Sequence, residues 1–158
     1  MTESLSLEAI AASYLAGTRF FDDCIAQVNA DNIDKCEPGE WTARQVIHHV
    51  ADSEAQSYAR LRRLLAEPNP VIQGYDEAAW AECEALGYQE LPIENSVAVF
   101  RAVRAASLDL IQRLTPSQLS LVGVHTESGP YDVAKWIATY SNHPREHGEQ
   151  LLRALNSQ

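Results

Sequence analysis

The sequence predicts an all-α fold, a four-helix bundle with short extra helices in its connections. Apolar residues recur at spacings of three and four along four long stretches, which is the period of an amphipathic helix. Irregular segments that contain glycine and proline join these stretches. Hydrophobic residues make up 46% of the 158 residues, enough for one continuous core. We therefore expect one helical-bundle domain over residues 1–158.

The four long helices are expected over residues 6–30, 42–66, 93–114 and 132–155. Ser6 suits the N-cap of the first, because its hydroxyl can accept from a free backbone N–H. Thr42 should cap the second, since Gln45 completes a capping box and Trp41 lies at the staple position.

The connections between the long helices are expected to be mostly irregular. Residues 31–40 read as a loop. Residues 76–86 read as a short helix that Gly87 ends, and Pro116 should open a further helical turn. Residues 121–131 are expected to be a plain connection.

The charge balance argues against two classes of partner. Twelve basic against 22 acidic residues give a net charge of −10, and such a surface repels phosphate backbones and anionic lipids. Residues 1–4 show no basic or apolar leader, and no apolar run reaches the ~18 residues of a membrane span. We expect a cytoplasmic protein that binds neither nucleic acid nor membrane.

Two histidines of the last helix suggest a metal site. His143 and His147 stand one turn apart on the helix face that also carries Trp136, Tyr140 and Leu151. Buried imidazoles need partners, and a divalent metal is one such partner. Bonds to backbone, carboxylates or water are the alternative, so a third ligand is needed to decide.

The second helix offers His48 and His49 as that third ligand. On a helical wheel His49 lies at the edge of the apolar stripe, beside Ser53 and Arg60, whereas His48 projects toward solvent or a subunit contact. We therefore favour His49 and keep His48 as the alternative. Three imidazoles without a fourth protein ligand have the stoichiometry of an open, catalytic-type zinc site, which would also accept nickel, copper or iron.

Other polar residues near these histidines are expected to have ordinary roles. Four carboxylates are expected to be mostly solvated, with support of a histidine ring as the alternative; they are Asp52, Glu54, Glu146 and Glu149. His125 is expected to hold loop backbone. Pro144 lies inside the HxxxH pair, so it frees the Tyr140 carbonyl and predicts a kink.

Three segments resemble the DinB/YfiT-like family, in that family's order and spacing. They are residues 41–53 (WTARQVIHHVADS), 74–80 (GYDEAAW) and 143–151 (HPREHGEQL). The resemblance covers most of the chain from Trp41 onward. It implies an up-down-down-up bundle, one divalent ion (zinc or nickel), a homodimer, and ligands at His49, His143 and His147. Pro144 and a short N-terminus depart from the family pattern.

The same resemblance implies a metal-dependent hydrolase whose open three-histidine site activates water toward a small-molecule substrate. Tyr58, Arg60 and Tyr140 are candidates to orient that substrate or stabilise charge, and no general base stands out. Two alternatives stay open. One is a metal-dependent S-transferase that holds a low-molecular-weight thiol as thiolate. The other is a non-enzymatic metal-binding stress protein.

Overall fold

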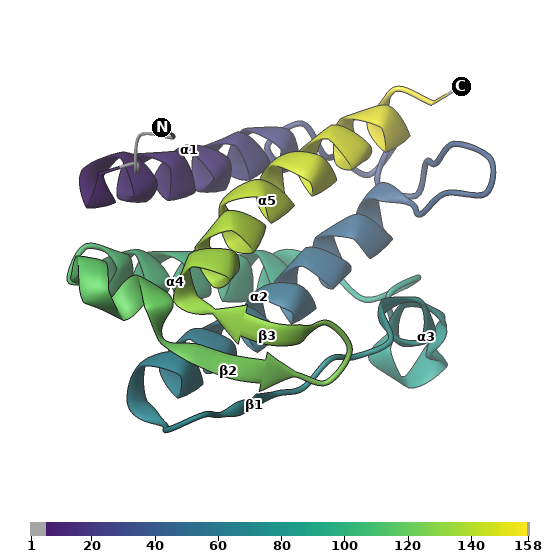
Figure 1. Cartoon of the computed structure of the whole chain (residues 1–158). Coiled ribbons are helices and arrows are strands. Elements are labelled where there is room, and N and C mark those ends of the chain that lie inside the picture. The colour runs from purple at the N-terminus through teal and green to yellow at the C-terminus, as the bar shows by residue number, and fades with distance from the viewer. Residues whose placement is uncertain (1–5, 158) are drawn as a thin grey trace.

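The computed structural model describes residues 6–157 and has the predicted bundle (Figure 1). Its long helices are α1 (Leu7–Ile25), α2 (Ala43–Ala66), α4 (Glu94–Ile111) and α5 (Val133–Leu155). Helices α1 and α5 run in one direction and α2 and α4 in the other, which is the up-down-down-up order (Figure 1). The expectation that the chain has no leader was based on residues 1–4, and these lie outside the described residues. None of the helices in that range combines the length and apolar character of a membrane span.

Side-chain caps fix where the helices begin. Ser6 Oγ accepts from Ala9 N at 3.1 Å, and Thr42 and Gln45 form both halves of the expected capping box. Asp132 caps α5 in the same way by accepting from the Lys135 backbone. These contacts satisfy N–H groups that have no partner inside the helix.

Two helices end earlier than expected. Helix α1 stops at Ile25 instead of residue 30, because Asn29 and Asn32 bond to nearby backbone groups and favour turns over helix. Helix α4 stops at Ile111 instead of residue 114.

The short helical segments follow the prediction closely. Helix α3 (Glu77–Glu82) and a 3₁₀ turn (Glu84–Leu86) fill the expected stretch. Gly87 ends the turn at φ 64°, a left-handed conformation that glycine adopts without strain. A further 3₁₀ segment, Pro116–Ser120, begins at the expected proline.

The expectation of a plain connection over residues 121–131 was wrong, because this segment forms a β-hairpin. Strands β2 (Val122–His125) and β3 (Gly129–Asp132) pair antiparallel, and β1 (Val71–Ile72) adds in parallel to β2. Gly129 takes a φ of 74° as β3 begins. The small sheet lies across the end of the bundle where α2 finishes and α5 begins (Figure 1).

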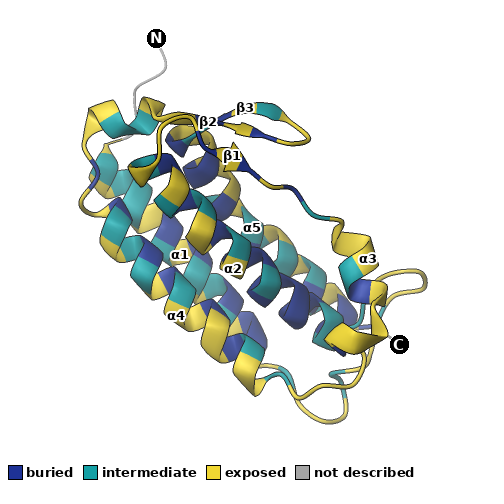
Figure 2. Ribbon diagram, turned by 90° about the horizontal axis from the view of Figure 1, so that it is seen from below, coloured by how far each residue is buried: buried dark blue, intermediate teal, exposed yellow. Residues whose placement is uncertain are grey.

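The bundle core has two apolar clusters separated by buried polar residues. One cluster contains Phe21, Val46, Val50, Phe100 and Leu151, and the other contains Tyr14, Leu61, Ile111, Trp136 and Ile137. Between them along the helices lie four buried polar side chains, which we call the polar layer: Glu54, Ser57, Arg104 and Ser107. Figure 2 shows the buried inner faces of the helices in dark blue. On α2 the residues of the polar layer, Glu54 and Ser57, lie one to two turns after His49.

Arg104 forms an ion pair with Glu54 inside this layer. Arg104 Nη1 lies 3.2 Å from Glu54 Oε1, and both side chains have almost no exposed surface. The expectation that Glu54 is solvated was therefore wrong. Its carboxylate also accepts from Ser57 Oγ at 3.0 Å.

The Arg104 guanidinium also ties α4 to α1 and α5. It donates to the Tyr14 carbonyl at 2.7 Å and to the Tyr140 carbonyl at 2.6 Å. The latter is the carbonyl that Pro144 leaves without its helical partner. Arginine therefore satisfies the backbone group that the proline freed, one turn before His143.

Candidate metal centre

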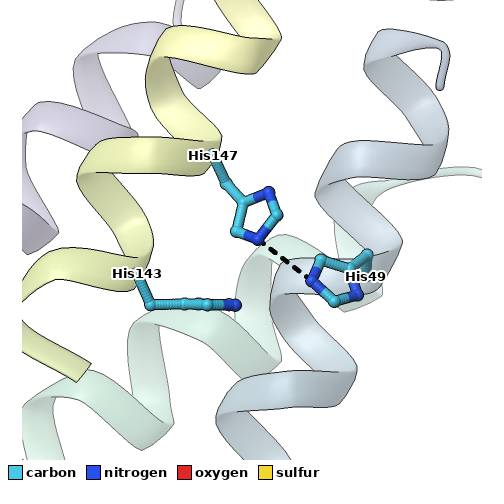
Figure 3. Close-up of side chains that lie close together, drawn as sticks. All are labelled: His49, His143 and His147. Carbon is cyan, nitrogen blue, oxygen red and sulfur yellow. Dashed lines mark hydrogen bonds between the residues drawn. The ribbon is translucent and has the colours of Figure 1, made fainter. Parts of the chain in front are cut away.

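Three histidines from two helices converge inside the bundle. His49 comes from α2, and His143 and His147 come from α5 (Figure 3). One nitrogen from each ring lies within 4.8 Å of the other two. The dashed line in Figure 3 joins His49 Nε2 and His147 Nε2, which are 3.1 Å apart. We call these three residues the histidine triad.

The triad leaves buried nitrogen atoms without partners. His49 Nδ1 and both ring nitrogens of His143 are buried and have no hydrogen-bond partner among the described residues. Such atoms are costly unless a ligand or water contacts them. In a tetrahedral zinc site, bonds of about 2.0–2.1 Å place two nitrogens about 3.3 Å apart. The donor set, and the 3.1 Å that separates His49 Nε2 from His147 Nε2, therefore fit a divalent ion.

A neighbouring amide orients one ring of the triad. His147 Nδ1 lies 2.8 Å from Gln150 Oε1, and an amide oxygen only accepts, so the Nδ1–H is the donor. In the neutral ring, Nε2 then carries the lone pair. Metal-binding histidines are commonly held in this way through their other nitrogen.

Burial keeps all three rings neutral at pH 7. It lowers the pKa of His49 to about 3, with a further contribution from His147. Burial also lowers the pKa of His143 well below its ordinary value and lowers that of His147. Trp41 covers His49, with ring centroids 4.9 Å apart. Neutral rings are the form that binds a metal.

His48 does not face solvent, so that expectation was wrong. Only 5% of its surface is exposed. Its Nδ1 lies 2.8 Å from Ser96 Oγ and its Nε2 3.1 Å from the Leu91 carbonyl oxygen, so it links α2 to the start of α4. Both nitrogens have protein partners, in contrast to those of His143.

The three residues expected to orient the substrate or stabilise charge do not lie together in the structure. Tyr140 and Arg60 line a pocket that also reaches His143, and Arg60 Nη1 donates to Tyr140 Oη at 3.1 Å. Tyr58 does not join them, because its ring is 39% exposed and lies under the Arg62 guanidinium at 3.3 Å.

The other polar residues hold parts of the scaffold. Asp52 accepts from Tyr88 Oη at 2.6 Å, and Glu146 accepts from Asn142 Nδ2 at 2.6 Å. His125 Nδ1 accepts from the backbone N–H of Glu127 at 3.2 Å, so it holds loop backbone as expected. None of these hydrogen bonds involves the histidine triad.

Glu77 is the site residue that sequence reasoning missed. Its Oε2 lies 3.9 Å from His49 Nε2, and the side chain is half-exposed. Asp76 caps α3 and so places Glu77 at its first position, over the triad. Burial raises the pKa of Glu77, with a smaller raising effect from Glu127 and an opposing one from Arg60. The available signal was its place in segment 74–80, which resembles the family.

The fold and this centre define a class of protein: a four-helix bundle with three converging histidines on its second and last long helices. The chain belongs to the DinB superfamily, whose family model matches residues 3–151. It is similar in structure to YfiT from Bacillus subtilis, described as "a probable metal-dependent hydrolase with an unusual four-helix bundle topology". That likeness has a TM-score of 0.82 at 25% sequence identity and covers 100% of this chain and 94% of YfiT.

Two relatives share the name "putative metal-dependent hydrolase". One, from Oceanobacillus iheyensis, is 37% identical over 130 residues, which cover 82% of this chain and 74% of the relative. The other, from Bacillus mycoides, is 38% identical over 109 residues, covering 69% and 61%. The match therefore spans less than two thirds of the B. mycoides protein.

Proposed function

We propose that this protein is a metal-dependent hydrolase whose single divalent ion, zinc or nickel, is held by His49, His143 and His147. The observation that carries the proposal is the convergence of three neutral imidazoles, of which His49 is buried and the other two are partly buried. Buried ring nitrogens of His49 and His143 have no hydrogen-bond partner among the residues that the structure describes. The names of the relatives support the same class of reaction. When bound, such an ion supplies a Lewis acid that polarises a substrate oxygen and lowers the pKa of water.

The chain's own residues would position the substrate and move a proton. Gln150 keeps His147 Nε2 turned to the centre, and Trp41 shields His49 from water. Glu77 Oε2 is the group placed to take a proton from an attacking water.

The proposal is tested with untagged protein that is stripped by a chelator and then reloaded with zinc or nickel. Hydrolysis of a panel of small esters and amides should appear only in the loaded protein and disappear again on chelation. The His48→Ala variant is the matched control, since His48 lies next to His49 but its nitrogens bond elsewhere. Hydrolysis that is equal with and without metal would contradict the proposal.

Glu77 has a separate test. Glu77→Gln keeps the size of the side chain and removes its ability to accept a proton, so kcat should fall on the order of 10²–10⁴-fold. The metal content should not change. Unchanged kcat in Glu77→Gln would rule out this residue as the base.

The same assay distinguishes the two alternatives. Metal-dependent consumption of an added thiol by an electrophile, with no hydrolysis, would favour a thiol S-transferase. Absence of both activities in the loaded protein would favour a non-enzymatic metal-binding role.

A further inference from the structure

A pocket of about 290 Å³ adjoins the histidine triad, and most of the residues that line it have no part in the proposed function. It lies between α2, α5, the segment that follows β1 and the hairpin that β2 and β3 form. The residues used below, Arg60, Tyr75, Tyr131, Lys135, Tyr140 and His143, all line it. We call it the Arg60 pocket.

Arg60 forms no ion pair within 4.0 Å of a carboxylate among the residues that the structure describes. Five of the nine other arginines lie within 4.0 Å of an acidic side chain in the described part of the chain; they are Arg44, Arg63, Arg101, Arg104 and Arg153. Arg60 instead donates to two neutral oxygens, Tyr140 Oη at 3.1 Å and the Gln73 carbonyl at 2.8 Å. In a chain of net charge −10, a partly buried arginine without an acidic partner is well suited to bind an anionic ligand.

The wall around Arg60 offers further donors. Arg60 Nε, Tyr75 Oη and Tyr131 Oη are buried and have no hydrogen-bond partner in the described part of the chain. Tyr140 Oη accepts from Arg60, so its own O–H remains a donor. Lys135 adds a second cation whose nearest bonded group is Ser128 Oγ at 3.3 Å.

These hydroxyls stay protonated at neutral pH. Burial raises the pKa of Tyr75 to about 12 and raises the pKa values of Tyr131 and Tyr140. They therefore act as donors and add no negative charge. The pocket joins a guanidinium to several O–H donors, which is the chemistry that binds an acceptor-rich anion.

The pocket and the triad are continuous. His143 belongs to both, and its ring lies 5.9 Å from that of Tyr140, one turn earlier on α5. A ligand held by Arg60 would therefore have its other end near the triad. The pocket volume of about 290 Å³ is just below the range of about 300–1,000 Å³ for small-molecule sites, so the ligand is small.

We propose that the Arg60 pocket binds a carboxylate of the substrate, so that the substrate class is a small carboxylic acid with its hydrolysable group beside the triad. This inference rests on the proposed function for the reaction, but the binding of the carboxylate needs no metal. Glu77 and Glu127 line the same pocket. Their negative charge disfavours a dianion such as phosphate and leaves a monoanion as the better match.

The test uses the metal-free full chain and two probes of equal shape, N-acetylglycine and N-acetylglycinamide. Titration followed by NMR should show tighter binding of the acid. Arg60→Met should weaken binding of the acid on the order of 10–100-fold and leave the amide unchanged. Arg62→Met, on the same helix and outside the pocket, is the matched control.

Tyr140→Phe provides a second variant that keeps the packed ring. It should weaken binding of the acid in the same direction as Arg60→Met. Equal binding of acid and amide, an unchanged affinity in Arg60→Met, or tighter binding of inorganic phosphate than of N-acetylglycine would overturn the inference.

The zinc content of each variant separates the two proposals. Wild-type zinc content in an Arg60→Met protein that loses binding of the acid supports the carboxylate site. If the wild-type protein binds no metal but still binds the acid through Arg60, the pocket stands and the proposed function fails. If zinc binds but acid and amide bind equally, the carboxylate site fails and the proposed metal centre stands.

Discussion

At the scale of single residues, the contacts of Arg104 hold the interior of the bundle together. Arg104 is paired with Glu54 in a site closed to water, and it satisfies carbonyls of α1 and α5. Removing one partner of a buried pair leaves an uncompensated charge. We predict that Arg104→Met lowers the free energy of unfolding by about 3–5 kcal/mol, measured by urea denaturation.

Arg101→Met is the control for this prediction. Arg101 lies one turn earlier on the same helix and pairs with Asp22 at the surface, so its loss should cost about 0–1 kcal/mol. The double variant Arg104→Met/Glu54→Gln should lose less than the sum of the two single variants. Similar losses for Arg104→Met and Arg101→Met would refute the role given to the buried pair.

The helical spacing of Glu54 and Arg104 in the sequence already indicated that both side chains face the core. Glu54 and Ser57 continue the series Ile47, Val50, Leu61 and Leu64 at steps of three and four, and Arg104 lies between Phe100 and Ser107 in the same way. Charged residues are seldom buried unless paired, so the expectation of solvated charges prevailed. A partner on another helix cannot be recognised from one helix's periodicity.

The pKa values of the triad make stability depend on pH. In the unfolded chain these histidines titrate near pH 6.5. In the folded metal-free protein their pKa values are lowered, that of His49 to about 3. The free energy of unfolding therefore keeps the full contribution of these histidines above about pH 6.5. It falls as the pH drops below that value, because the unfolded chain takes up protons that the folded chain does not. Each group contributes up to about 1.4 kcal/mol per pH unit.

The check is urea denaturation of the metal-free protein between pH 7.5 and 5. The variant His49→Gln/His143→Gln/His147→Gln should lose less stability over this range than the wild type. His48 and His125 are present in both proteins, so their titration cancels in the comparison. Parallel losses would mean that the triad is not the source of the pH dependence.

At the scale of secondary-structure elements, the close contact between α1 and α5 positions the turn that carries His143. A Cβ at Gly17 would lie 2.9 Å from the Ser141 carbonyl oxygen and 3.2 Å from Pro144 Cγ. We predict that Gly17→Ala destabilises the protein by about 1–3 kcal/mol, because the helices must separate. Thermal unfolding measures the change.

Whether Gly17→Ala lowers or raises the stability of the protein decides between a tight and an unconstrained helix contact. Replacing glycine by alanine in an unconstrained helix stabilises it by about 0.5–1 kcal/mol. A more stable Gly17→Ala protein would show that the close approach of α1 and α5 does not constrain this turn.

Helices were predictable at this scale, whereas the sheet was not. Thr42 with Gln45 and Ser6 marked helix starts through local contacts that neighbouring residues specify. Strand β1 has two residues, and its partner Val124 lies about fifty positions away from Val71. Such a pairing depends on tertiary contacts that local propensity does not encode.

At the scale of the whole molecule, the homodimer stays a prediction. Sedimentation equilibrium of the full chain should give twice its mass of 17.5 kDa if it forms. A single species of one chain mass at micromolar concentration would contradict it.

The sequence allowed the three histidines of the triad to be picked out, each for its own reason. The spacing of His143 and His147 follows from helix geometry, and the wheel favoured His49 over His48. The structure brings these three rings together, while their role as ligands remains a prediction. Glu77 and the Arg60 pocket could not be derived from periodicity, because connections between helices place them.

The central claim is that His49, His143 and His147 hold one divalent ion, and elemental analysis of untagged protein tests it most directly. The account predicts one ion per wild-type chain, its loss in His49→Ala, His143→Ala and His147→Ala, and its retention in His48→Ala. A wild-type protein without bound metal after reloading, or loss of metal in His48→Ala with retention in His49→Ala, would contradict it.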